Sequence, residues 1–360
     1  MDITVPASCE LPDLAARWME LESRASGGFF LSWRWIGSWL RTTGIKPLLI
    51  QATDNGQILA LGLLTPSRRR RLMLGVNQIC LHETGQAKFD AVMIEHNNFL
   101  IADRAPAHMV TDLLKALQTA DARWDEIVLG GVGTDMVAQA QAAGLTVVTD
   151  RLSPDYGVTL PGPALAWEDT LSSNQRAQLR QSRSFAERMG PLMLKSADSP
   201  SQALDFFEKM IVLHTAYWQG RGKPGAFASP FSRSFHREVI TAQGCSGAAQ
   251  LLELSAGSEV LGYLYNFQYG ERAYSYQSGF SYSDDNRHRP GLLAHAMAIE
   301  QARQRGMRVY DFLAGDAPYK ARLGQELGRL VWCRAQRNSP LLRGERAARA
   351  LYSRLRGADR

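Results

Sequence analysis

The segment Gln250–Phe280, QLLELSAGSEVLGYLYNFQYGERAYSYQSGF, carries the clearest fold signal in this sequence. Three runs rich in Leu, Tyr and Phe are separated by two turn signals, Ser255–Ser258 and Tyr269–Glu271. Runs of this length, bounded by glycine-containing turns, are typical of antiparallel strands joined as hairpins. The segment therefore predicts a three-stranded antiparallel meander.

The same order of elements occurs earlier in the chain. The segment PLLIQATDNGQILALGLL (47–64) predicts two strands joined at Asp54-Asn55-Gly56, and RLMLGVNQICL (71–81) predicts a third. Each meander is followed by a helical segment (106–122 or 290–306) and then by a strand (125–132 or 307–315). We therefore predict an α+β fold duplicated in tandem, each copy a mixed, largely antiparallel sheet flanked by helices. The expected domains are 1–165 and 166–338, with a basic helix at 339–360.

Composition narrows the classes of function. The 360 residues carry a formal net charge of +6, which favours anionic partners. No apolar run is long enough to span a membrane and the first residues do not resemble a signal peptide, so a cytoplasmic protein is expected. The run Arg68–Arg71 is more typical of a solvated turn than of a nucleic-acid site, so we expect no nucleic-acid partner. The four scattered cysteines, Cys9, Cys80, Cys245 and Cys333, argue against a disulfide framework or a bound metal.

The predicted strand 307–315 and the residues after it carry the candidate chemistry. In YDFLAGDAPYK (310–320), Asp311 stands inside an apolar strand where the first copy has Ile127, so we assign catalysis to the second copy. Asp311, Tyr319, Tyr276 and Lys320 are the candidate catalytic residues. The alternative role of Asp311 is structural, as an acceptor for loop N–H groups.

A candidate anion site lies at the start of the predicted helix 290–306. Pro290 sets helical φ, and the free N–H groups that follow, with the helix dipole, attract negative charge. The preceding strand is expected to place Tyr274, Tyr276, Ser278 and Phe280 on one face, with Gly279 at a bulge or close approach. The cofactor candidates are Ser278, Gly279, Phe280, Arg287, His288, Arg289, Gly291 and Leu292. The alternative is a capped helix with a solvated basic loop.

These segments together resemble the GNAT acyltransferase superfamily. More narrowly, they resemble the CelD/BcsL-type acetyltransferases associated with exopolysaccharide and cellulose production, a branch close to the FemABX peptidyltransferases. The resemblance spans about residues 170–335, and YDFLAGDAPYK (310–320) is its most specific part. The phosphate loop, usually Q/R-x-x-G-x-G/A, reads here as HRPGLL (288–293) and departs at its first and last positions.

The resemblance implies acetyl-CoA or another acyl-CoA as co-substrate and a sugar or polysaccharide precursor as acceptor. For acyl transfer from a thioester, Asp311 would be the general base or would orient the acceptor. Tyr319 would be the proton donor with Tyr276 as its rival, and Lys320 would stabilise the oxyanion or hold an anionic acceptor. One alternative is a FemABX-like transferase that uses aminoacyl-tRNA and a cell-wall precursor. Another is a scaffold that binds a nucleotide without catalysis.

Further basic and polar residues are candidates for acceptor binding. Arg176, Arg180 and Arg183 have helical spacing and form one stripe. The glycine-rich loop 220–230 contains Arg221 and Lys223, with His236 close behind, and His96 and Asn97 lie in a polar segment of the first copy without metal-binding spacing. The substrate-binding candidates are therefore Arg180, Arg221, Lys223, His236, His96 and Asn97. The arginine-rich helix 339–360 suggests contact with the inner face of a membrane, or else docking on the protein.

Overall fold

The computed structural model describes residues 1–5, 10–71, 74–120, 123–162, 164–242 and 249–357; Cys9 and Cys245 lie outside them. The chain forms two compact units. The first unit comprises Met1–Ile36, Thr43–Leu152 and Leu330–Arg360, and the second comprises Gly37–Thr42 and Ser153–Arg329. The fold is α+β, with mixed sheets flanked by helices, as predicted.

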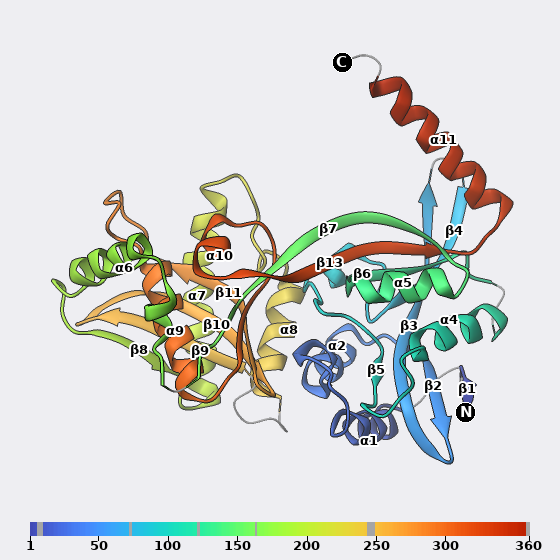
Figure 1. Cartoon of the computed structure of the whole chain (residues 1–360), viewed down its shortest axis with the longest axis horizontal. Helices are drawn as coiled ribbons and strands as arrows, with labels where there is room; N and C mark the ends of the chain where they lie inside the picture. The colour runs from blue at the N-terminus through green and yellow to red at the C-terminus, as the bar shows by residue number, and fades with distance from the viewer. Residues whose placement is uncertain (6–9, 72–73, 121–122, 163, 243–248, 358–360) are drawn as a thin grey trace. The chain divides into compact units, whose positions relative to one another are not determined.

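The first unit contains a mixed sheet of strand order β1-β2-β3-β4-β6-β13, drawn in blue, teal and red in Figure 1. Its hairpin turn has positive φ at both central residues, Asn55 (48°) and Gly56 (77°), which is the mirror-image turn that the sequence predicts. The strands β4 and β6 are parallel and are connected through α4. The elements that begin in this part of the chain are β1 (Asp2–Thr4), α1 (Leu11–Glu22), α2 (Trp33–Thr43), β2 (Leu48–Asp54), β3 (Gln57–Arg71), β4 (Leu74–Leu81), α3 (Ala87–Asp90), β5 (Leu100–Ile101), α4 (Met109–Ala120), β6 (Glu126–Gly133), α5 (Thr134–Ala142) and β7 (Thr146–Thr159).

The second unit repeats this plan with the strand order β7-β12-β11-β10-β9-β8. The meander expected at 250–280 is confirmed, since β10 pairs antiparallel with both β9 and β11. Its helices and strands are α6 (Ser173–Ala186), β8 (Leu192–Ser196), α7 (Pro200–Gln219), α8 (Pro230–Thr241), β9 (Ala249–Ala256), β10 (Glu259–Tyr269), β11 (Arg272–Phe280), α9 (Pro290–Gln304), β12 (Val309–Ala314) and α10 (Pro318–Leu323), and the chain continues into β13 (Gln325–Gln336) and α11 (Pro340–Gly357).

The last strand of the N-terminal repeat, β7, joins the sheet of the second unit. The last strand of the C-terminal repeat, β13, joins the sheet of the first unit. The end of β7 pairs antiparallel with β12, from Asp155↔Ala314 to Thr159↔Val309. The end of β13 pairs antiparallel with β6, from Leu330↔Gly133 to Gln336↔Glu126. The compact units therefore differ from the sequential halves 1–165 and 166–338 by this exchange of strands, and also because Gly37–Thr42 belongs to the second unit.

The strands β11 and β12 form a fork in the second sheet. They are parallel and connected through α9, but they pair only from Arg272↔Val309 to Tyr274↔Asp311. Beyond that point β11 is paired with β10, whereas β12 is paired with β7, so the two strands separate. Buried apolar side chains of the sheet and α9, including Leu254, Leu264 and Ile299, form the core beside the fork.

A β-bulge in β11 corrects one expectation from the sequence. Tyr265 pairs with Gln277 and Asn266 with Ser275, so Tyr276 is an extra residue opposite β10. A bulge reverses the alternation of the residues that follow it. Tyr276 therefore contacts α8, whereas Phe280 contacts Gly291 of α9. The prediction that Tyr276 shares a face with Ser278 and Phe280 is wrong for this reason.

No helix among the described residues is both long and apolar enough to cross a lipid bilayer.

Candidate functional site

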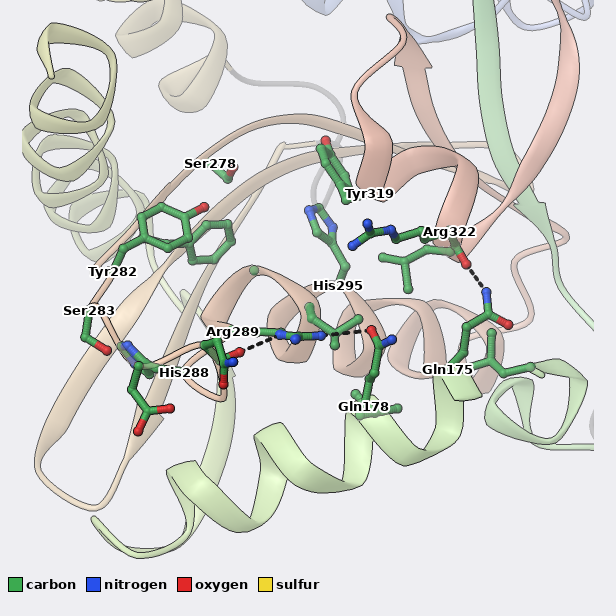
Figure 2. Close-up of a pocket in the computed structure, with 18 of the residues that line it drawn as sticks. Gln175, Gln178, Ser278, Tyr282, Ser283, His288, Arg289, His295, Tyr319 and Arg322 are labelled. Atoms are coloured by element: carbon green, nitrogen blue, oxygen red, sulfur yellow. Dashed lines mark hydrogen bonds between the residues drawn. The ribbon is translucent and has the colours of Figure 1, made fainter. Parts of the chain in front are cut away.

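A cavity of about 710 Å³ lies in the second unit, at the start of α9. It is bounded by α6, by the end of β11 with the loop after it, and by α10, and Figure 2 shows the side chains that line it. Six of the predicted cofactor residues line it: Ser278, Phe280, His288, Arg289, Gly291 and Leu292. Tyr319 lines it too, and the amides of Asn174, Gln175 and Gln178 face it from α6. The structure thus brings most of the candidates for cofactor binding together.

The first turn of α9 is an anion site by its backbone geometry. The residue before the helix, Arg289, forms no side-chain cap, and Pro290 begins the helix. The first backbone N–H bonded to a carbonyl within this turn is that of Leu293, so the N–H groups of Gly291 and Leu292 remain for a ligand. Both residues line the cavity. An anion there would receive two backbone hydrogen bonds and the favourable helix dipole.

The Arg289 guanidinium is fixed beside these N–H groups. Its Nη1 donates to Oε1 of Gln178 on α6 at 2.8 Å, and its Nε donates to the Asn286 carbonyl at 2.7 Å (Figure 2). Gln178 is neutral, so this hydrogen bond orients the guanidinium without cancelling its charge. Arg322 of α10 places a second guanidinium on the cavity wall.

Asp285 is the one acid among the described residues that line the cavity, and it is paired with Arg287. Nη2 of Arg287 lies 2.6 Å from Oδ2 of Asp285, and this hydrogen-bonded partner holds the pKa of the Asp285 carboxyl well below its usual range. Arg287 itself does not line the cavity. Its positive charge offsets the negative charge of Asp285 through this ion pair. Burial lowers the pKa of His288 although Asp285 opposes this, which favours a neutral ring. The positive charge of the cavity therefore comes mainly from Arg289 and Arg322.

His295 and Tyr319 form a stacked pair in the cavity, with ring centroids 5.2 Å apart and planes at 13°. Tyr319 is 42% exposed, whereas His295 is buried. Sequence reasoning identified Tyr319 but missed His295 and Arg322. The available signal for His295 was its spacing, one helical turn beyond Gly291, which places both residues on one face of α9.

Lys320 stabilises the end of β12. Its buried ammonium donates to the carbonyls of Leu313 (3.0 Å) and Ala314 (2.7 Å). These contacts point the amine toward the backbone turn between β12 and α10. Lys320 does not line the cavity, although its neighbour Tyr319 does.

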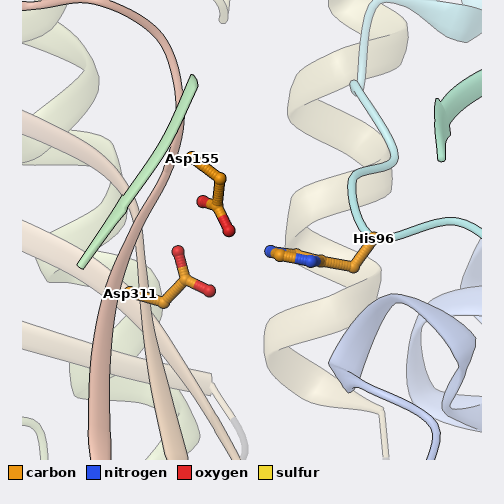
Figure 3. Close-up of side chains that lie close together, drawn as sticks. All are labelled: His96, Asp155 and Asp311. Atoms are coloured by element: carbon orange, nitrogen blue, oxygen red, sulfur yellow. The ribbon is translucent and has the colours of Figure 1, made fainter. Parts of the chain in front are cut away.

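Asp311 lies at the fork and is completely buried. Its Oδ1 accepts the N–H of Leu313 at 2.7 Å, which holds Leu313 in the left-handed region (φ 63°), and its Oδ2 accepts Nη1 of Arg272 at 2.7 Å. This hydrogen bond from a backbone N–H is the contact expected if Asp311 has a structural role. A second buried carboxylate, Asp155 of β7, faces Asp311 in Figure 3, with oxygens within 4.8 Å. Sequence reasoning missed Asp155.

Both acids, Asp311 and Asp155, stabilise the charged form of Arg272. Burial lowers the pKa of Arg272, but the charges of Asp311 and Asp155, together with the Asp311 hydrogen bond, raise it by more. The charges of two close carboxylates therefore both act on the Arg272 guanidinium at the fork. The pair does not line the cavity described above.

Tyr276 and His236 form a buried cluster on the opposite face of the sheet. Nε2 of His236 lies 3.3 Å from the Tyr276 hydroxyl, and Nδ1 lies 3.4 Å from that of Tyr265. Burial lowers the pKa of His236 to about 3, so the ring is neutral. The structure brings these two candidates together, but not to the cavity.

Gly279 is explained by close packing. A Cβ at this position would lie 2.4 Å from the Met210 carbonyl oxygen of α7, so only glycine permits this approach. The expectation of a close backbone approach at Gly279 is confirmed. The neighbouring Ser278 carbonyl lies 2.9 Å from Nδ1 of His214 on the same helix.

Three of the acceptor candidates lie on the surface of the second unit. Arg180 is exposed on α6. In the loop after α7, the exposed Arg221 lies 3.7 Å above the Tyr217 ring, and Nζ of the exposed Lys223 lies 5.6 Å from the Trp218 ring. These cations are available to an acidic ligand.

The two candidates in the first unit differ in their surroundings. Asn97 is buried, and its Nδ2 donates to the carbonyls of Leu81 and Gly130 while its Oδ1 lies 2.9 Å from Nδ1 of His82. These bonds give Asn97 a structural role between β4 and β6. His96 has a positive φ of 49° in the same segment.

The arginine run 68–71 is not a turn. It forms the end of β3, where Arg71 is buried and bonded to Glu126. Arg71 also lies 3.6 Å from Glu345 of α11, and Nη1 of Arg346 donates to Gln336 at 2.6 Å. The first turns of α11 therefore dock on the first unit. The outer side chains of this helix, 349–360, lie outside the described residues.

Comparisons with known proteins agree with this geometry. Residues 173–321 match the family model described as "Acetyltransferase (GNAT) domain". Among solved structures, FemX is similar with a TM-score of 0.59 and 13% identity, covering 95% of this chain and 99% of FemX. The C-terminal domain (DUF2156) assigned to a lysylphosphatidylglycerol synthetase of Agrobacterium fabrum has a TM-score of 0.54 at 11% identity, covering 95% of each chain. L-PGS from Bacillus licheniformis has a TM-score of 0.52 at 12% identity, covering 91% of this chain and 93% of that one.

No curated protein sequence matches the chain. The CelD/BcsL subtype therefore stays a prediction. The family match and the shared fold establish that this chain contains a GNAT-fold acetyltransferase-like domain.

Proposed function

We propose that the protein is an acyl-CoA-dependent acyltransferase whose second unit binds the donor. The observation that carries this proposal is the uncapped start of α9, whose free N–H groups and neighbouring Arg289 open into the 710 Å³ cavity. A diphosphate fits such a site because backbone donors, helix dipole and guanidinium all favour negative charge. The cavity volume is also in the usual range for ligand sites, about 300–1,000 Å³.

The thioester end of the donor would lie toward the fork between β11 and β12, near Tyr319. The acceptor amine or hydroxyl attacks the acyl carbon, the carbon–sulfur bond breaks, and the CoA thiolate leaves. Tyr319 is the proposed proton donor to that thiolate, because its ring lines the cavity. Asp311, in the fork with Asp155 beside it, is the proposed base that takes the proton of the acceptor.

The proposed acceptor is a sugar amine or hydroxyl on a precursor of an exopolysaccharide or of cellulose. The resemblance to CelD/BcsL-type acetyltransferases supports this class of acceptor. The exposed Arg180, Arg221 and Lys223 would attract an acidic or phosphorylated precursor to the second unit. The acetyl group is the proposed acyl group, and no metal is proposed.

A second candidate is aminoacyl transfer from tRNA, which the resemblance to FemABX transferases implies. The similarity to FemX extends over nearly the whole of both chains, and this observation favours the candidate. The arginines Arg68, Arg69 and Arg70 of β3 are exposed and would suit a nucleic-acid donor.

Calorimetry with acetyl-CoA and with aminoacyl-tRNA separates the two candidates. Acetyl-CoA should bind the wild-type protein, and Arg289→Gln should weaken binding at least 10-fold, which is about 1.4 kcal/mol. Arg308→Gln is the matched control, because Arg308 is an exposed arginine of the second unit paired with Glu271 at 2.9 Å. Binding of aminoacyl-tRNA without binding of any acyl-CoA would refute the first proposal and support the second.

A further inference from the structure

A series of buried hydrogen bonds runs from the interior of the second sheet to the cavity. Nδ2 of Asn266 on β10 donates to the Tyr310 hydroxyl oxygen at 3.2 Å, and that hydroxyl lies 3.3 Å from Nδ1 of His295 on α9. The three residues are 2%, 0% and 4% exposed. Buried polar groups arranged in this way are strongly oriented, because unpaired alternatives are costly in a low dielectric.

The series assigns the position of the proton on the His295 ring. The amide N–H of Asn266 donates to the Tyr310 oxygen, and the Ser275 side chain is hydrogen-bonded to the same hydroxyl. With Ser275 also donating, both lone pairs of the Tyr310 oxygen are occupied, and the Tyr310 proton is left for Nδ1 of His295. A neutral imidazole that accepts at Nδ1 carries its proton on Nε2. His295 therefore presents an N–H donor rather than a lone pair at Nε2.

The ring is neutral and held in one orientation. Burial and, to a lesser degree, the charge of Lys320 together lower the pKa of His295 to about 3. Tyr319 stacks on one face of the ring, while Phe312 and Phe280 contact it edge-on. Among the described residues none is hydrogen-bonded to Nε2, and His295 lines the cavity beside Tyr319 and Arg322 (Figure 2).

We propose that His295 is a further catalytic residue, whose Nε2–H donates a hydrogen bond to the carbonyl oxygen of the bound thioester. This inference rests on the proposed acyl-CoA function. As the acceptor atom bonds to the acyl carbon, the carbonyl oxygen becomes an oxyanion and the hydrogen bond strengthens. The carbon–sulfur bond then breaks, and His295 keeps its own proton throughout. Tyr310 and Asn266 are positioning residues that fix the tautomer.

The tautomer is tested without any ligand. Nitrogen-15 NMR of the full chain labelled in histidine should show His295 as a neutral ring protonated at Nε2. Tyr310→Phe removes one hydroxyl and should mix the two tautomers of this ring. A wild-type ring protonated at Nδ1 would overturn the inference while leaving acyl-CoA binding untouched.

The donor role is tested with acetyl-CoA carrying carbon-13 in its carbonyl group. The infrared carbonyl stretch of the bound thioester should lie at lower frequency in wild type than in His295→Leu, with Kd changed less than about 3-fold. His295→Gln keeps an N–H donor at a similar place and should retain most of the shift. His108→Leu, at an exposed histidine of the first unit, is the matched control and should behave as wild type.

Turnover gives the third readout. His295→Leu should lower kcat for acetyl transfer or slow acetyl-CoA hydrolysis by about 10²–10³-fold, as loss of an oxyanion donor does. An unchanged carbonyl frequency in His295→Leu, with acetyl-CoA bound and the melting temperature preserved, would refute the donor role. Absence of acetyl-CoA binding by wild type would instead refute the proposed function, and with it this role of His295.

Discussion

Replacing Asp311 by asparagine separates a chemical role of this acid from a structural one. Asparagine retains an oxygen that accepts the Leu313 N–H, but it removes the negative charge that accepts from Arg272. A hydrogen bond to a charged group is worth about 1.5–3 kcal/mol and a neutral one about 0.5–1.5 kcal/mol. Because the Arg272 side chain is 36% exposed, the lower part of the difference applies, and we expect a loss of about 1 kcal/mol.

That loss predicts a decrease in melting temperature of about 2–4 °C. If Asp311 is the base, kcat should fall by about 10²-fold or more, far beyond the effect on folding. Asp311→Ala also leaves the Leu313 N–H without its acceptor, which costs a further 1–3 kcal/mol or so. The asparagine variant should therefore be nearly as stable as wild type and almost inactive, and the alanine variant should be clearly less stable.

Calorimetric melting and steady-state kinetics on the same samples measure both quantities. Arg272→Gln is the matched control, because it removes the same ion pair and leaves the carboxylate. It should lose more stability than the asparagine variant, because Asp311 and Asp155 then face each other without that cation, but it should keep measurable turnover because the carboxylate remains. Asparagine activity that falls only in proportion to the unfolded fraction would refute the catalytic role and leave Asp311 as a structural acceptor.

Three further predictions concern other parts of the chain. Gly291→Glu should weaken acetyl-CoA binding at least 10-fold in calorimetry; Gly291→Ala measures how much of the effect comes from the Cβ, which would lie 3.2 Å from the Phe280 ring. Burial raises the pKa of Glu83 to about 8, above its ordinary 4.5, so its contribution to the free energy of unfolding is greatest below pH 4.5 and decreases up to about pH 8. Denaturant titrations should therefore show that Glu83→Gln gains stability relative to wild type across this interval, and a constant difference would contradict the assignment. Deleting residues 340–360 should reduce co-sedimentation with anionic vesicles if the basic helix contacts a membrane, and equal pelleting of both proteins would exclude this contact.

The sequence predicts the repeated parts of this fold well. The turn at Asn55-Gly56 requires positive φ at two residues, and few residue types adopt it, so the hairpin was predictable from local chemistry alone. The start of α9 was predictable for the same reason, because Pro290 and Gly291 have distinct backbone preferences. The candidate cofactor site depends on these local signals.

Features set by tertiary packing were not predictable in this way. The bulge at Tyr276 depends on pairing with β10, and strict alternation gave the wrong face. Asp155 faces Asp311 only because β7 pairs with β12, which no local pattern in the sequence indicates. His295 looks like an ordinary core residue of an apolar helix until Tyr310 and the cavity are located beside it.

The exchange of β7 and β13 has a consequence for synthesis on the ribosome. The apolar strand β6 acquires its partner β13 only when residues 330–336 have been made, about 200 residues later. At translation rates of about 5–20 residues per second, this interval lasts roughly 10–40 s. During it, one edge of β6 is an unpaired template for another nascent chain. The N-terminal repeat therefore leaves the ribosome incomplete, and we expect chaperones to protect that edge until the final strand arrives.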